Sequence, residues 1–355
     1  MRVLVVGGGP AGCAYAVTAA RAGHSVVLLD DGRRPATWPG EALPAGGAEL
    51  VESIFGAGAL EGHAEAYGTR AAWGSADLAA HDFMAHWAGR GYHLDRAVFD
   101  ETLRERARSA GVEVVVERVN ELTGGAGNWR INDRWDADWL VDASGRAGAL
   151  VGRLGVPRIS LDTQVALIAV VPDAGGERVT TVEAVSEGWW YSAPLPGGQR
   201  VAAIVTDADL VGSDRSRCWR DALDQAPHIA MLVDTTVGAE VSAYPAGAAY
   251  RRQLHGDGWV AVGDAAVSVD PLSSQGLITG IVMAAHAARL LGSDLGGWER
   301  DYLAVLAEHE ETRAWLYAAE TRWPAADFWA RRSGTASGHT STTRARRVSR
   351  PGSRS

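Results

Sequence analysis

Three glycines near the N-terminus are spaced to bind the phosphates of a nucleotide. Gly7, Gly9 and Gly12 form the pattern G-x-G-x-x-G, with Pro10 and Ala11 inside it, directly after a short apolar run. In such a turn Gly7 permits a tight bend, Gly9 lets the backbone approach a pyrophosphate, and Gly12 lets the following helix pack closely on the strand. The N–H groups at the start of that helix then face the anion. The pattern predicts a dinucleotide-binding β-α-β unit.

An acidic residue in the expected place supports this interpretation. Asp30 ends the next apolar run, residues 25–29. There its carboxylate can accept hydrogen bonds from the hydroxyls of an adenosine ribose. Strand, glycines, helix and acid in this order distinguish the unit from an isolated glycine-rich loop.

A second glycine-containing corner lies far downstream. Gly263 and Asp264 end another apolar run, and Pro271, Gln275 and Gly276 follow before a helix-like stretch. An NAD domain does not need this element, whereas FAD does, because its ribityl chain and isoalloxazine ring extend beyond the pyrophosphate. Asp264 is placed to bind a ribityl hydroxyl, and the helix N-terminus after Gly276 can face the ring edge that becomes anionic on reduction. We therefore expect residues 271–276 to form the wall facing the ring, although Gly263-Asp264 alone could be a turn that ends a strand.

Several further segments resemble one family of flavoproteins. They are Gly40 to Pro44, Trp73 to Ser75, Tyr92 to Asp100, Val141 to Arg146, Gly188 to Tyr191 and Asp270 to Gly276. Together they resemble the FAD-dependent monooxygenases related to tryptophan halogenases. The most similar branch hydroxylates a peptidyl tryptophan during the maturation of quinone cofactors. The resemblance spans roughly residues 1–331.

This resemblance implies a fold and a reaction. The fold class is α/β: an FAD-binding Rossmann-like domain of the aromatic-hydroxylase type, with an inserted mostly-β substrate domain and C-terminal helices. The implied reaction uses molecular oxygen and a flavin hydroperoxide to hydroxylate an aromatic ring, either a free small molecule or a carrier-bound or peptidyl side chain. The alternatives are a flavin-dependent dehydrogenase or reductase on the same scaffold, a flavin-dependent halogenase, and a flavin-binding escort for a peptide or carrier-bound partner.

The resemblance also suggests roles for individual residues. It places Arg96 near the pyrophosphate and Glu41 near the flavin ring, where an exposed helix start and a surface loop are the alternatives. Trp190 and Tyr191 could stack a planar substrate over the flavin, with core packing as the competing explanation. Ser273 belongs to the expected ring-facing wall and is a further catalytic candidate.

Two departures from related families narrow the prediction. The chain contains no lysine, since all 34 of its Lys and Arg residues are arginine. Tryptophan halogenases rely on an active-site lysine, so lysine-dependent halogenation is disfavoured. Single-component aromatic hydroxylases carry an Asp-Gly motif where this chain has Asp142-Ala143-Ser144-Gly145. This departure leaves two alternatives open for the source of electrons, a built-in NADPH site and a separate flavin reductase.

Composition excludes other classes. Hydrophobic residues make up 46% of the 355 residues and charged residues 22%, which is typical of a soluble globular protein. A net charge of −9 argues against nucleic acid as a partner. No apolar run is long enough to span a membrane, and the N-terminal apolar run is read as a strand rather than a signal peptide, so a cytoplasmic protein is expected. Cys13 and Cys218 alone offer no disulfide framework, and no Cys/His spacing suggests a metal site.

The changes in pattern along the chain predict four parts. Residues 1–163 and 251–296 form the FAD-binding domain, and residues 164–250, with short β-like runs between Gly/Pro turns, form the substrate-binding sheet. Residues 297–331 form a C-terminal helical element. Residues 332–355 contain no acid and are expected to be a disordered basic tail.

Overall fold

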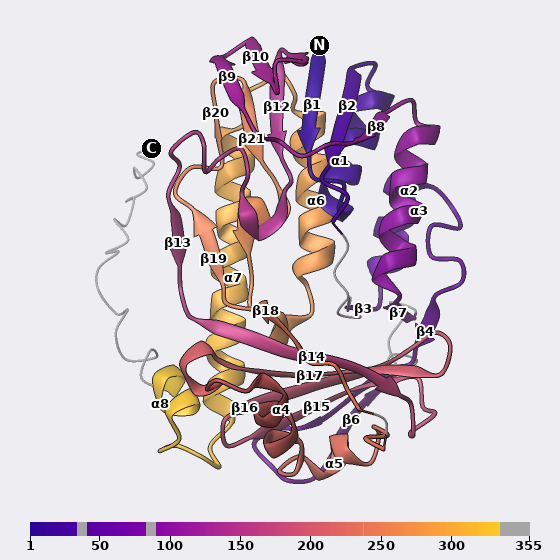
Figure 1. Ribbon diagram of the computed structural model, residues 1–355, viewed down its shortest axis with the longest axis vertical. Helices are drawn as coiled ribbons and strands as arrows, with labels where there is room; N and C mark the ends of the chain where they lie inside the picture. The colour runs from indigo at the N-terminus through magenta and orange to yellow at the C-terminus, as the bar shows by residue number, and fades with distance from the viewer. Residues whose placement is uncertain (34–40, 83–89, 237, 334–355) are drawn as a thin grey trace, which may run out of the picture.

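Two large sheets form the ends of the molecule, with long helices running between them (Figure 1). The computed structural model describes residues 1–33, 41–82, 90–236 and 238–333. The six-stranded sheet lies at the top of the view and the seven-stranded sheet at the bottom.

The six-stranded sheet is the dinucleotide-type sheet that the N-terminal pattern predicts. Its strands, in spatial order, are β20 (His255–Gly256), β21 (Trp259–Ala261), β12 (Trp139–Asp142), β1 (Arg2–Val6), β2 (Ser25–Asp30) and β8 (Glu113–Val116). All neighbours are parallel except β20 and β21. Val6 of β1 is in register with Asp142, and Asp142 with Ala261. The turns that follow β1, β12 and β21 therefore meet at one edge of the sheet, where open α/β sheets bind ligands.

Two helices with many small residues lie side by side against this sheet. They are α1 (Pro10–Arg21) and α6 (Gly276–Arg289). Buried alanines, among them Ala14 and Ala16 on α1 and Ala284 and Ala288 on α6, leave room for the two backbones to approach each other. The N-termini of both helices consequently lie near the same edge of the sheet.

The seven-stranded sheet is almost entirely antiparallel. Its strands, in spatial order, are β18 (Ser242–Pro245), β14 (Gln164–Pro172), β17 (Gln199–Asp207), β16 (Gly188–Leu195), β15 (Val179–Val185), β5 (Gly68–Ala72) and β6 (Ala79–Asp82). One face packs on α4 (Arg215–Leu223) and α5 (Pro227–Ala230) through a cluster that includes Trp190 and Trp219. The other face carries Trp189 and faces the remainder of the protein.

Strands β5 and β6 lie in a different sheet from the one that the predicted boundaries imply. Residues 1–163 were expected to belong to the FAD-binding part, but β5 pairs in parallel with β15 and extends the seven-stranded sheet. The pattern within 68–82 is too short and too polar to indicate which sheet it joins. The segment therefore crosses from one part of the protein to the other.

Three small sheets and two helices complete the connections. The sheets are β11 (Trp135–Ala137) with β10 (Asn128–Ile131) and β9 (Leu122–Gly125), β13 (Arg158–Ser160) with β19 (Ala249–Arg251) and β22 (Val267–Ser268), and β3 (Glu41–Leu43) with β7 (Gly91–Leu94) and β4 (Ala64–Ala66). The helices are α2 (Gly47–Phe55) and α3 (Arg96–Ser109).

The C-terminal helices join the two large sheets. The helix α7 (Gly296–Ala319) buries Trp298 and Tyr302 beside the six-stranded sheet and Tyr317 beside the seven-stranded one, and α8 (Asp327–Ser333) follows. The prediction that the basic tail begins at residue 332 is wrong for Arg332. This side chain is buried and its guanidinium lies 2.6 Å from the Asp207 carboxylate, so an ion pair holds it in α8. Residues 334–355 lie outside the described part of the chain.

Helices that cross a membrane are long and predominantly apolar. Within residues 1–33, 41–82, 90–236 and 238–333, none of the helices is long and apolar enough to cross a membrane.

A buried histidine makes stability depend on pH. His93 of β7 is fully buried, its Nε2 lies 3.0 Å from the Thr180 hydroxyl, and burial lowers the pKa of His93 to about 4. An unfolded histidine titrates near pH 6.5, so between pH 4 and 6.5 the unfolded chain binds one proton more than the folded chain does. We expect His93 to make the free energy of unfolding rise with pH in this window, by up to about 1.4 kcal/mol per pH unit.

Denaturant unfolding of the His93→Gln variant at pH 4.5, 5.5, 6.5 and 7.5 checks this. The pH slope should be shallower than in the parent protein. An equal slope in the His93→Gln variant would contradict the assignment.

Candidate active site

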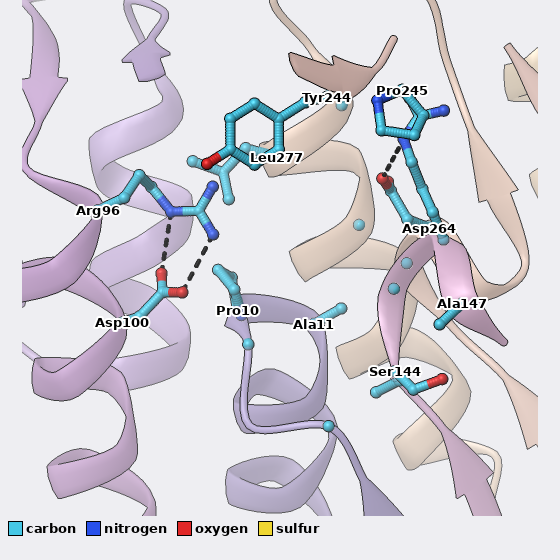
Figure 2. Close-up of a pocket in the computed structure, with 18 of the residues that line it drawn as sticks. Pro10, Ala11, Arg96, Asp100, Ser144, Ala147, Tyr244, Pro245, Asp264 and Leu277 are labelled. Atoms are coloured by element: carbon cyan, nitrogen blue, oxygen red, sulfur yellow. Dashed lines mark hydrogen bonds and ion pairs between the residues drawn. The ribbon is translucent and has the colours of Figure 1, made fainter. Parts of the chain in front are cut away.

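A single cavity of about 840 Å³ lies between the two large sheets and is lined by both. Figure 2 shows its central part, with Pro10, Ala11, Ser144 and Ala147 on one side and Tyr244 and Leu277 on another. Its wall contains most of the residues singled out in the sequence, namely Gly7, Gly9, Pro10, Ala11, Asp30, Arg96, Tyr191, Gly263, Asp264, Pro271 and Gly276.

The N-terminal glycines have the geometry expected of a nucleotide-binding turn. Gly7 has a φ of +112°, and a Cβ there would lie 2.2 Å from the Ala143 carbonyl oxygen. A Cβ on Gly12 would lie 1.9 Å from the Gly7 carbonyl oxygen, so Gly12 serves helix packing and does not line the cavity. Nothing lies within 4 Å of a Cβ on Gly9, because this position faces the cavity. A side chain at residue 9 would stand in the space available to a ligand.

Asp30 is held over the same turn. The side chain is 7% exposed, and its Oδ1 accepts the Gly32 N–H at 2.9 Å. A Cβ on Gly8 would lie 2.4 Å from Asp30 Oδ2, so Gly8 is needed for the carboxylate to sit there. Arg104 of α3 donates to the Gly8 carbonyl at 3.1 Å and fixes the turn from the other side. Neither Gly8 nor Arg104 was identified from the sequence.

The second corner packs directly on the first. Gly263 has a φ of +58°, and a Cβ there would lie 2.7 Å from the Cβ of Ala11. Asp264 is partly exposed on the cavity wall, with its Oδ2 3.3 Å from Arg146 Nε. Arg158 donates to the Asp264 carbonyl at 3.3 Å. Burial and the neighbouring arginines lower the pKa of Arg158. Arg146 also lines the cavity, and although it lies in the segment that carries the family resemblance, the sequence analysis did not select it.

Two helix N-termini open into the cavity. Pro10 and Ala11 begin α1, and Gly276 and Leu277 begin α6, and all four line the cavity. Helix N-termini carry partial positive charge and unpaired N–H groups, which favour anions. The cavity can therefore bind a pyrophosphate at one helix N-terminus and a second negatively charged group of the ligand at the other.

Arg96 points into this space from the first turn of α3 (Figure 2). Its guanidinium makes a two-pronged ion pair with Asp100, at 2.9 and 3.1 Å, and both residues are largely buried. The ion pair fixes the direction of the arginine side chain, and both Arg96 and Asp100 line the cavity. Asp100 lies one helical turn after Arg96, and that spacing could have identified it.

The part of the cavity under the seven-stranded sheet is apolar and aromatic. We call it the aromatic chamber. Its wall comprises Ala166 and Ile168 of β14, Trp189 and Tyr191 of β16, Val201, Ala203 and Val205 of β17, and Tyr244, Pro245 and Ala246 at β18. Small side chains on β14 and β17 leave the space, and the aromatic rings border it.

The prediction that Trp190 contacts the substrate is wrong. Trp190 is fully buried on the opposite face of the sheet, where its ring packs edge-on against Trp219. Successive side chains of a strand point to opposite faces, so Trp190 and Tyr191 cannot both face one site. Trp189 shares the face of Tyr191 and lines the chamber instead.

Two other predicted residues, Ser273 and Gln275, do not line the cavity. Ser273 donates its hydroxyl to the Asp270 carbonyl, and its neighbour Ser274 takes the place in the wall. Gln275 is exposed at the N-cap position of α6, where its side chain makes no capping hydrogen bond, and it lies outside the wall. Glu41 is the first residue of β3, but its side chain lies outside the described residues.

Asp142 is used within its own loop. Its Oδ1 accepts the Ser144 N–H and hydroxyl, and its Oδ2 accepts the N–H groups of Leu150 and Val151 at 2.8 Å. The carboxylate is 1% exposed. It therefore shapes the loop after β12 rather than presenting a charge to a ligand.

These features fit FAD. The open position at Gly9 and the α1 N-terminus suit the pyrophosphate, Asp30 suits the ribose, and Asp264 suits the ribityl chain. The α6 N-terminus suits the ring edge that gains negative charge on reduction. Fold and site together define an FAD-dependent oxidoreductase.

Comparison with known proteins identifies the family. Residues 69–310 match the family model described as tryptophan halogenase, and residues 5–46 match the NAD(P)-binding Rossmann-like domain. The chain belongs to the tryptophan halogenase family. This finding confirms the family, the fold class and the FAD cofactor expected from the sequence.

Individual relatives differ in the reaction for which they are named, and both a hydroxylase and a halogenase are among them. LodB of Marinomonas mediterranea, named as an FAD-dependent oxidoreductase, is 30% identical, with 93% of this chain and 96% of LodB covered. The peptidyl tryptophan dihydroxylase QhpG, essential for tryptophylquinone cofactor biogenesis, superposes with a TM-score of 0.79 at 27% identity, covering 94% of this chain and 78% of QhpG. The tryptophan 2-halogenase of Chondromyces crocatus is 26% identical over 83% of this chain and 60% of that enzyme.

A cofactor-binding prediction follows from the open position at Gly9. We expect Gly9→Ala to weaken FAD binding at least about tenfold, which corresponds to about 1.4 kcal/mol, because the added methyl group enters the cavity. Titration of the apoprotein with FAD, followed by quenching of flavin fluorescence, measures this.

Gly125→Ala is the matched control. A Cβ on Gly125 of β9 also meets nothing within 4 Å, but this residue lies away from the cavity. Its FAD affinity should equal that of the parent, and both variants should keep the parent's unfolding midpoint. Equal FAD affinity in Gly9→Ala and Gly125→Ala would contradict the placement of the pyrophosphate.

Proposed function

We propose that this protein is an FAD-dependent monooxygenase that hydroxylates an electron-rich aromatic ring, an indole or a phenol, carried on a peptide or a carrier. The observation that carries the proposal is the continuity of one cavity from the FAD-binding turns to a chamber bordered by Trp189, Tyr191 and Tyr244. Similarity to QhpG, which is named for acting on peptidyl tryptophan, supports the same substrate class.

The charge of the aromatic chamber favours a substrate whose amino and carboxyl groups are not free. Among the described residues of β14, β16, β17 and β18 that line it, none carries a charged side chain. Burying an ammonium or carboxylate there without a partner would cost several kcal/mol. A tryptophan within a peptide places neutral amides next to its ring and avoids this cost. The same chamber therefore suits a side chain better than a free amino acid.

The residues of the chain position the reactants. Bound FAD supplies the electrons that activate molecular oxygen. Trp189 and Tyr191 offer ring faces and edges against which a planar substrate packs, and the small residues of β17 leave room for it. The apolar wall would exclude water from the substrate ring, and the α6 N-terminus would stabilise the negative charge that bound FAD gains on reduction. Holding the substrate ring close to the flavin in a fixed orientation would raise the rate of hydroxylation.

Halogenation is the second candidate, because the matched family model and one of the relatives above are halogenases. The absence of lysine from the whole sequence weighs against a lysine-dependent halogenation. A separate flavin reductase is part of the proposal, since Asp142 is engaged within its own loop.

The product of turnover tests the proposal. The protein, supplied with FAD, a flavin reductase, NADH, oxygen and a tryptophan-containing peptide, should add oxygen atoms to the peptide, seen as a gain of 16 or 32 mass units. Added chloride or bromide should give no halogenated product. Asp264→Ala should lose most of the product together with bound FAD. Halogenated peptide, or a reduced double bond in an isoprenoid offered as substrate, would contradict the proposal.

The uncharged wall leads to a binding prediction. We expect N-acetyltryptophanamide to bind the FAD-loaded protein at least tenfold more tightly than free tryptophan, because the free amino acid must bring two charges to an apolar wall. Titration followed by the flavin absorbance spectrum measures both affinities. Equal or tighter binding of free tryptophan would show that charged groups of the substrate are recognised after all.

A further inference from the structure

One buried hydroxyl joins the two halves of the cavity. Tyr317 of α7 is 3% exposed, and its oxygen lies 2.7 Å from Gln164 Nε2, 3.0 Å from Trp189 Nε1 and 3.0 Å from Asp270 Oδ2. The amide and indole nitrogens can only donate, so the phenol proton must point to Asp270. The hydroxyl thus uses its two lone pairs and its proton, each with a partner in a different element.

Each end of this network reaches the cavity wall. At one end, Trp189 borders the aromatic chamber. At the other end, Asp270 accepts the Leu272 N–H at 2.9 Å and so caps the short turn 271–273. Pro271 and Ser274 at that turn line the FAD half of the cavity. Tyr317 is therefore the shared partner of the substrate wall and the cofactor wall.

The turn beside the cofactor needs this support. Ser274 has a φ of +52°, a left-handed conformation that costs a non-glycine residue free energy unless the surrounding structure holds it. Burial raises the pKa of Asp270, while the Leu272 N–H and the Tyr317 hydroxyl stabilise its charged form. Burial and the Asp270 charge both raise the pKa of Tyr317, which keeps the phenol proton in place. The Tyr317 to Asp270 hydrogen bond consequently has one direction.

We propose that Tyr317 is a positioning residue that couples occupancy of the aromatic chamber to the surroundings of the flavin ring. The inference rests on the proposed function, because it takes an indole as the occupant of the chamber. A substrate ring that packs against Trp189 shifts the Trp189 N–H. The Tyr317 hydroxyl, which accepts from this N–H, passes the shift to Asp270 and to the 271–274 turn. Because both lone pairs and the proton of this hydroxyl are engaged, it cannot rotate to absorb the movement without losing a hydrogen bond.

Removal of the hydroxyl tests the coupling. The full-length protein is loaded with FAD and titrated with N-acetyltryptophanamide, and the change in the flavin absorbance spectrum at saturation is measured. Tyr317→Phe should keep FAD bound and reduce that change at least threefold, since the ring remains and the oxygen does not. The matched control is Tyr302→Phe, a buried phenol on the same helix that shares none of these partners. It should show the parent's spectral change.

The outcomes separate this inference from the proposed function. A Tyr317→Phe protein with the parent's spectral change overturns the coupling, as does a parent protein whose flavin spectrum does not respond to the probe. If Tyr317→Phe does not fold, Asp270→Asn cuts the same network at the other end. The amide has one oxygen where the carboxylate has two, so either the Tyr317 hydroxyl or the Leu272 N–H faces an N–H group and one link to the turn is lost. A full response in Asp270→Asn overturns the proposal. The peptide product, measured separately on the parent protein, decides the proposed function whatever the coupling shows.

Discussion

The packing of Gly263 against Ala11 is the contact on which the site depends. Two turns that are far apart in the chain meet here because β1, β12 and β21 end in register at one edge of a parallel sheet. A side chain at residue 263 would push the turns apart, and the N-termini of α1 and α6 would no longer open into one space. The position of the cavity, and of each residue that lines it, follows from that approach.

The FAD half of the site could be predicted from the sequence because its determinants are local. Gly7 and Gly12 have no room for a Cβ, and Gly9 faces the cavity. Asp30 is the last residue of β2, and Asp264 lies in the turn after β21. Local pattern also held enough information to exclude Trp190 beside Tyr191, since a strand alternates its faces. The error came from reading Gly188 to Tyr191 as a cluster of aromatics rather than as part of a strand.

The aromatic half could not be predicted in the same way, because it is assembled from tertiary contacts. The Tyr317 hydroxyl finds Gln164 and Asp270 across long stretches of sequence, and no spacing connects them. Arg332 looked like the start of a polar tail, yet its partner Asp207 lies at the end of β17. A buried ion pair of this kind depends on the final fold, so charge pattern along the chain does not reveal it.

The parallel pairing of β5 with β15 also has a consequence for how the molecule is made. The strand β5 comes from the first quarter of the chain and pairs with the nearby β6, but its other neighbour, β15, is synthesised much later. Until β15 is made, the edge of β5 that pairs with it is open to intermolecular association. Excision of residues 164–250 as a separate piece would leave the edge of β15 without its partner β5, so this sheet is complete only when the early strand is present.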